Sequence, residues 1–155
     1  MKLSVLHTYL TQAAHVARPE QLTAELESGE PEGVFRTTGN GLVVYRHQYT
    51  GRIVLEHGAC DLLHLLALVH VWMEENAGDG DHNRFLGWAG EAVDDRQADI
   101  DLRFQFEEEV HYVPAEPEYA GDDKLTWRGT DYKRAAEQVN TAAQLEGDTV
   151  TAEIG

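Results

Sequence analysis

The sequence predicts an α+β fold: a small, mostly antiparallel (mixed) sheet packed by two helices, with an extended C-terminal arm. Two segments place apolar residues at helical spacing, and several others are rich in β-branched and aromatic residues with few breakers. After Pro114 the apolar pattern loses its regular period. We therefore expect an α+β domain over residues 1–114, followed by an arm or appendage over residues 115–155 that is partly ordered by contacts with partners.

The N-terminal segment predicts an amphipathic helix over residues 2–17, because its apolar residues recur every three or four positions. Pro19 closes this helix, since a proline disfavours helical backbone at the residue before it. The following QLTAELESGE alternates apolar and polar residues, which indicates a short strand ending at Gly29; a second helical turn after Pro19 is the alternative. Four glycines and a proline over residues 29–41 predict a turn-rich connection.

The next two elements are a two-sided strand and an apolar helix. Residues 42–55 are rich in Val, Ile, Tyr and Thr, and Gly51 marks a bulge or a bend within them. Residues 62–76 carry apolar side chains on nearly every side, and Asp61 is a suitable N-cap. A helix of this kind is either buried against a sheet or covered by a neighbouring subunit.

Residues 85–94 and 98–112 predict an antiparallel hairpin, because only a short acidic turn separates them. The second strand has an apolar face and a polar, mostly charged face, because the two kinds of residue alternate along it. Glu108 and Glu109 interrupt this alternation, so we expect a β-bulge there. In the arm, a short helix over residues 131–145 is the regular element that the pattern allows. The apolar face of the second strand consists of Ala98, Ile100, Leu102, Phe104 and Phe106.

The charge of the chain excludes one class of function. Its 155 residues include 12 Lys and Arg against 28 Asp and Glu, a formal net charge of −16. A chain this acidic does not hold a nucleic acid by neutralising phosphates, because that requires clustered basic side chains. The same charge is compatible with repulsion of DNA, with mimicry of DNA, or with solubility alone.

The sequence also predicts a protein made inside the cell and not inserted into a membrane. Its single cysteine, Cys60, excludes an internal disulfide framework and fits a reducing compartment. The opening MKLSVLHTYLTQAAHVA lacks the continuous apolar run of a signal peptide. The longest apolar stretch, Leu62 to Met73, is interrupted by histidines and is too short to span a bilayer.

One group of residues has the donor atoms of a metal site. His57, Cys60 and His64 lie close together in the sequence, and Cys60 and His64 share a helix face if the helix includes both. His70 points away from them, so at most three ligands converge. The alternative is a small buried cysteine beside interfacial histidines. No catalytic or nucleotide-binding signature occurs in the sequence, so we expect no catalytic residue, cofactor or resident metal.

Long two-sided elements without a catalytic constellation favour assembly with other copies of the chain. A ring requires each subunit to present two different surfaces. The strand over 42–55 and the helix over 62–76 offer apolar side chains for them, and the aromatic and basic residues of the arm offer anchors for docking onto an acidic neighbour. The expected interface residues are Tyr45, Tyr49, Leu65, Val69, Trp72, Trp127 and Tyr132.

Several local patterns together point to a family. They are the opening MKLSVLHTYL, a glycine-punctuated link, LVVYRHQYTGRIVL, a helix ending in LVHVWMEEN, and the strand ADIDLRFQFEEEVHYVP. In this order they resemble the tail completion protein R (GpR) family of temperate contractile-tailed phages over about residues 1–114.

The resemblance implies a structural virion protein in the tail–neck region, present in the host cytoplasm during assembly. Such a protein resembles a tail terminator: a ring, typically six-fold, that caps the tail tube and meets the neck proteins. Its implied partners are further copies of itself, the tail tube, the sheath and the neck or head-completion proteins. DNA passes through the ring without being specifically bound. No catalytic residues are carried over.

Two other functions are compatible with the sequence. An acidic DNA mimic would inhibit a host DNA-binding protein, and it would need carboxylates spaced like phosphates over one face. A small metal-dependent enzyme would use His57, Cys60 and His64.

Overall fold

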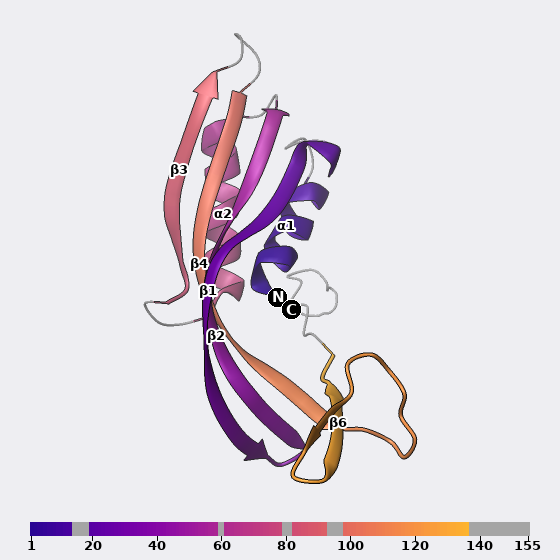
Figure 1. Cartoon of the computed structure of the whole chain (residues 1–155). Coiled ribbons are helices and arrows are strands. Elements are labelled where there is room, and N and C mark those ends of the chain that lie inside the picture. The colour runs from indigo at the N-terminus through magenta and orange to yellow at the C-terminus, as the bar shows by residue number, and fades with distance from the viewer. Residues whose placement is uncertain (14–18, 59–60, 79–81, 93–97, 137–155) are drawn as a thin grey trace.

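The computed structural model describes residues 1–13, 19–58, 61–78, 82–92 and 98–136. It confirms the α+β class: one curled sheet is packed by two helices (Figure 1). The elements, in chain order, are α1 (Lys2–Gln12), the 3₁₀ turn η1 (Pro19–Gln21), β1 (Leu22–Thr38), β2 (Gly41–Gly58), α2 (Leu62–Asn76), β3 (Arg84–Ala92), β4 (Ala98–Pro114), β5 (Leu125–Trp127) and β6 (Thr130–Arg134).

β4 is the central strand of the sheet. The main strand order is β1-β2-β4-β6-β5, and β3 also pairs with β4. β2 follows β4 along nearly its whole length, while the other side of β4 is divided between β3 at one end and β6 at the other. All of these pairings are antiparallel. The predicted hairpin is confirmed as β3 and β4.

Both helices contribute to one hydrophobic core on the same face of the sheet (Figure 1). The alternation predicted for the second hairpin strand is confirmed, because Leu102, Phe104 and Phe106 are completely buried. Phe104 and Phe106 stack with ring centroids 5.7 Å apart. The core residues of the helices are Leu3, Leu6, Leu10, Leu65, Val69 and Trp72.

α1 is shorter than predicted. Ala13 has φ −68° and ψ 123°, so the helix ends at Gln12 and does not reach residue 17; residues 14–18 lie outside the described part. The helix approaches the sheet closely at Gly51, where a Cβ atom would lie 2.6 Å from a methyl carbon of Leu3. The bulge expected at Gly51 occurs on the neighbouring strand, where Glu27 is the extra residue.

The predicted strand end at Gly29 and the turn-rich link over 29–41 are wrong. β1 continues through Pro31 to Thr38 and pairs with β2 throughout, joined to it by a two-residue turn. An edge strand tolerates these residues, because a proline's missing N–H can face away from the ladder and bulges absorb irregular spacing. The alternative of a helical turn after Pro19 is present as η1, which precedes the strand.

The expected bulge at Glu108 and Glu109 lies instead on the adjacent strands. Relative to β4, β2 carries one extra residue at Val44; relative to β2, β1 carries two residues, Val34 and Phe35, opposite Val44. Strands farther from β4 therefore follow a longer path around the same bend. This difference in length curls the lower half of the sheet (Figure 1).

α2 has the predicted bounds and the predicted cap. Asp61 Oδ1 accepts hydrogen bonds from the backbone N–H groups of Leu63 and His64 at 3.0 and 3.3 Å. One side of the helix is buried in the core, whereas Leu63 and Val71 are 78% and 49% exposed. Within the described part of the chain, neither helix is long and apolar enough to cross a membrane.

The arm contributes a strand where a helix was expected. Thr130–Arg134 forms β6, which pairs with β5 and with the last residues of β4, so the prediction of a helix from residue 131 is wrong at its start. The rest of that predicted helix, from residue 137, lies outside the described part. The division of the chain at residues 114 and 115 stays a prediction.

Candidate functional site

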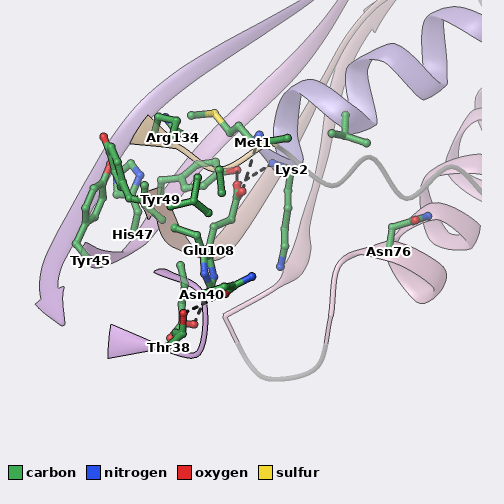
Figure 2. Close-up of a pocket in the computed structure, with 18 of the residues that line it drawn as sticks. Met1, Lys2, Thr38, Asn40, Tyr45, His47, Tyr49, Asn76, Glu108 and Arg134 are labelled. Carbon is green, nitrogen blue, oxygen red and sulfur yellow. Dashed lines mark hydrogen bonds and ion pairs between the residues drawn. The ribbon is translucent and has the colours of Figure 1, made fainter. Parts of the chain in front are cut away.

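A hollow of about 590 Å³ lies where the curled part of the sheet passes below the N-terminus of α1 (Figure 2). β2 and β4 contribute most of its wall, and the end of α2 and the residues that follow β6 complete the rim. Figure 2 shows side chains from these separate elements converging on the first residues of α1. Among its lining residues, Lys2, Tyr49 and Glu108 form a hydrogen-bonded group, and Lys2 also bonds to Asn83 and Glu107 beside the hollow.

Glu108 holds the start of α1. Its Oε2 accepts a hydrogen bond from the backbone N–H of Lys2 at 2.7 Å. The first N–H groups of a helix have no partner within the helix, and that end carries a partial positive charge. A carboxylate at this position therefore stabilises the helix, by about 0.3–1 kcal/mol through the dipole.

Tyr49 links the same carboxylate to the core. Its hydroxyl donates to Glu108 and accepts from the backbone N–H of Leu3 at 3.3 Å. Burial raises the pKa of Tyr49 far above its usual range, and the hydrogen bond to the negative Glu108 raises this pKa further. The hydroxyl is therefore protonated at neutral pH and donates to Glu108 there.

Lys2 joins three elements at once. Its Nζ donates to the carbonyl of Ala77, to Asn83 Oδ1 at 3.0 Å and to the carbonyl of Glu107 at 3.0 Å. Asn83 Oδ1 also accepts from the backbone N–H of Glu107 at 3.0 Å. Burial lowers the pKa of Lys2, while the charges of Glu108 and Glu107 oppose this effect. The side chain thus fixes α1 to the end of α2 and to β4.

An aromatic row on β2 continues the wall of the hollow. Tyr45, His47 and Tyr49 alternate on one face, with ring centroids 6.0 Å apart for the first pair and 5.2 Å for the second. The His47 ring extends toward Gly29 on β1, which is in register with Tyr49, and a Cβ atom at Gly29 would lie 2.3 Å from His47 Nε2. Glycine at this position leaves room for the imidazole ring in its present orientation.

The face of the sheet away from the helices carries paired charges across three strands. Arg52 on β2 contacts Glu25 on β1 at 2.8 Å and Asp101 on β4 at 2.9 Å. Arg46 makes the equivalent bridge from Glu32 on β1, at 3.2 Å, to Glu109 on β4, at 3.5 Å. Each arginine of the middle strand therefore joins an acidic residue on either side. Such cross-strand pairs contribute about 0.2–1 kcal/mol each.

Four of the seven expected interface residues lie in the core of the subunit. Tyr49, Leu65, Val69 and Trp72 are at most 3% exposed. Packing against α1 and the sheet covers these side chains, so they have no surface left for a neighbouring subunit. The apolar character that suggested an interface is used within the fold, and this part of the prediction needs correction.

The other three expected residues lie in the lower half of the molecule. Tyr45 is partly buried beside the hollow. Trp127 is partly buried and stacks on Phe35, while Tyr132 is 9% exposed and pairs in register with Pro114. The two arm residues thus contact the sheet of their own subunit.

The residues suggested as metal ligands are only partly described. His64 is exposed in the first turn of α2. His57 lies in β2, but its side chain and the whole of Cys60 lie outside the described part. Among the residues that the structure describes, no three metal-ligating side chains form a group.

Sequence reasoning missed the two residues that organise the hollow, Lys2 and Glu108. Glu108 and Glu109 suggested a β-bulge, and nothing in the spacing of the glutamates shows that the carboxylate of Glu108 faces a helix N-terminus. Lys2 gave no signal, because its three acceptors lie far from it in the sequence.

The fold and this site define a small α+β protein. The polar residues of the hollow connect elements of the subunit to one another. Its large exposed apolar residues lie on β1, β3 and α2. The family model for the P2 phage tail completion protein R (GpR) matches residues 1–133, and the chain belongs to this family. Neither a curated protein nor a solved structure matches the chain significantly.

Membership of this family confirms the resemblance and implies a structural role in phage tail completion, with a location in the virion tail. The family consists of structural tail proteins and not of enzymes. The match extends beyond residue 114 to residue 133 and so includes β5 and nearly all of β6.

Proposed function

We propose that this protein completes the phage tail as a subunit of a closed ring, six-fold in symmetry, that joins the tail tube to the neck or head-completion proteins. Family membership supports the role in tail completion. The ring is supported by one structural observation: among the described strands, β1 and β3 are different outer strands on opposite sides of β2 and β4, and each is paired on a single side; the third outer strand, β5, pairs with β6 at the other end of the sheet.

Two different outer strands suit a ring because its contacts are heterologous. Each subunit must offer one surface to the copy ahead and a different surface to the copy behind. Leu26 on β1 is 55% exposed, and Trp88 on β3 is 49% exposed. Large apolar side chains at exposed sheet edges promote association.

The acidic character of the chain fits the passage of DNA through such a ring. A net charge of −16 on every subunit repels phosphates and gives no basis for specific binding. The proposed partners are the tail tube, the sheath and the neck proteins. The proposed location is the tail–neck junction, after assembly in the host cytoplasm.

We propose that residues 115–155 act as an arm on the ring subunit. β5 and β6 connect the start of this segment to β4. Tyr45, Trp127 and Tyr132 remain proposed contact residues at the lower end, where the arm and the sheet meet.

The proposal is tested by the mass of the purified chain in solution, followed by negative-stain images and by binding to isolated tail tubes. A ring of about six subunits that binds one end of the tube is expected. A chain that stays monomeric and does not associate with tails would contradict the proposal.

The alternative of a DNA mimic has weaker support. A mimic needs free carboxylates on one extended face, whereas Glu25, Asp101 and Glu109 are all paired with arginines. Competition between this chain and DNA for a host DNA-binding protein would favour the mimic.

A further inference from the structure

We propose that the contact between neighbouring subunits is an added strand: the first half of β1 in one copy pairs with β3 of the next copy. This inference rests on the proposed ring and names the surfaces that build it. The partner is therefore a second copy of this chain, recognised through backbone hydrogen bonds and matched side-chain faces.

The two strands have unsatisfied backbone edges at the same level of the molecule. β1 pairs with β2 alone and β3 with β4 alone among the described strands, so each has one edge without a ladder partner. Figure 1 shows the first half of β1 and the whole of β3 at the same end of the molecule, on opposite sides of β2 and β4. Edges at the same level favour contacts that close into a ring.

The apolar sides of the two strands match. Leu26 pairs in register with Gly51, which faces Leu3 of α1, so Leu26 lies on the helix side of the sheet. Trp88 pairs with the buried Leu102 and lies on the same side. Adding β1 to β3 of the next copy therefore brings Leu26 toward Trp88 without reversing either face.

The helix beside β3 enlarges this apolar surface. The ring of His70 on α2 contacts Phe85 on β3, with centroids 5.7 Å apart, which places the two elements side by side. Leu63 and Val71 are exposed on α2, and the bulge residue Leu86 is 42% exposed on β3. The neighbour's β1 would cover part of this surface, and burial of apolar area yields about 25 cal/mol per Å².

The polar sides of the two strands also match. β1 carries four glutamates between residues 25 and 32; three of them pair with arginines of the same subunit, and Glu30 makes no ion pair with the described residues. At the start of β3, the exposed Arg84 donates to the neutral amide of Gln105 at 3.2 Å. An acidic strand edge facing this guanidinium favours the head-to-tail pairing over the pairing of two β1 edges, because like charges repel each other.

Lysine substitution tests the contact in the full chain. Leu26→Lys and Trp88→Lys each place a charge on one of the proposed edges, and we expect each to shift the ring to monomers, with association weakened at least about tenfold. Thr8→Lys adds the same charge at an exposed position of α1, outside the two strand edges and the proposed contact residues of the arm, and should leave the ring intact. An unchanged circular dichroism spectrum and a cooperative thermal transition show that the variants are folded, since dissociation alone lowers the melting temperature.

Cross-linking supplies a second test that does not depend on disruption. In a Cys60→Ser background, Leu26→Cys combined with Trp88→Cys should give a ladder of covalent oligomers with a short bis-maleimide. Leu26→Cys combined with Thr130→Cys should not. Rings that persist in both lysine variants, or a ladder from the second pair alone, would overturn the proposed contact and leave the ring standing. A monomeric original chain would remove both proposals.

Discussion

Phe35 on β1 stacks on Trp127 of β5, with ring centroids 5.6 Å apart and ring planes 25° from parallel. These strands are the first and the last in the main order of the sheet, so the stack joins its two ends. Phe35 has a φ of 48°, a backbone region that bulky residues rarely adopt. The bulge at Val34 and Phe35 turns the ring toward the arm, and Arg128 covers the Trp127 ring at 4.6 Å.

A double-mutant cycle measures this stack. We expect Phe35→Ala and Trp127→Ala to show a coupling energy of about 0.5–1.5 kcal/mol in the free energy of unfolding, because aromatic pairs contribute that much beyond buried area. Chemical denaturation followed by circular dichroism gives the four values. Pairing Thr8→Ala, at an exposed position of α1, with Phe35→Ala is the control and should show no coupling. If the effects of Phe35→Ala and Trp127→Ala were simply additive, the stack would not connect the two ends of the sheet.

Removal of the Glu108 carboxylate should destabilise the protein. Glu108→Ala leaves the Tyr49 hydroxyl and the Lys2 amide without their acceptor, at a cost of about 2–3 kcal/mol in the free energy of unfolding. Glu108→Gln keeps an acceptor oxygen and should cost about 1 kcal/mol. Denaturant unfolding gives the free energy of unfolding of each variant. Glu107→Gln is the control. If Glu107→Gln and Glu108→Gln lowered the free energy of unfolding equally, the Glu108 carboxylate would have no special role in stabilising the fold.

Alanine at Gly51 should separate α1 from the sheet. A Cβ there would lie 2.6 Å from a Leu3 methyl carbon and 3.0 Å from the Glu25 carbonyl oxygen. We expect Gly51→Ala to lower the free energy of unfolding by about 1–3 kcal/mol through overpacking. Gly39→Ala is a matched control, since no atom lies within 4 Å of a Cβ at that turn. If Gly39→Ala lowered the melting temperature as much as Gly51→Ala, overpacking against Leu3 would not explain the effect.

The ion pairs of Glu109 predict a dependence of stability on pH. The hydrogen bond from Arg36 holds the pKa of Glu109 below its usual value of 4.5, with smaller help from the charges of Arg36 and Arg46. A lowered folded-state pKa gives stability that is present above about pH 4.5 and is lost as the pH falls through the folded pKa. The pair is partly exposed, so its contribution is about 0.5 kcal/mol.

We therefore expect Glu109→Gln to be less stable than the original chain at pH 7 by this small amount, and the difference to shrink as the pH falls below about 4.5. Urea denaturation across this pH range provides the measurement. Glu30→Gln serves as the control, because Glu30 makes no ion pair with the described residues. A difference for Glu109→Gln that stays constant with pH would exclude the ionic explanation.

The sequence by itself determined the elements whose residues carry a complete local signal. α2 has its predicted bounds and its Asp61 cap, because helical periodicity and capping depend on residues a few positions apart. The β3–β4 hairpin and the buried face of β4 follow from alternation within one strand. Family membership is likewise predictable from these segments.

The tertiary structure alone decided the outer strands and the hollow. Residues 29–38 extend β1 despite their glycines and proline, and Thr130–Arg134 becomes β6, because an existing strand supplies the hydrogen-bonding partner. Glu108 meets Lys2 only after the sheet curls beneath α1. Strand pairing and side-chain convergence depend on contacts distant in sequence, and no local pattern encodes them.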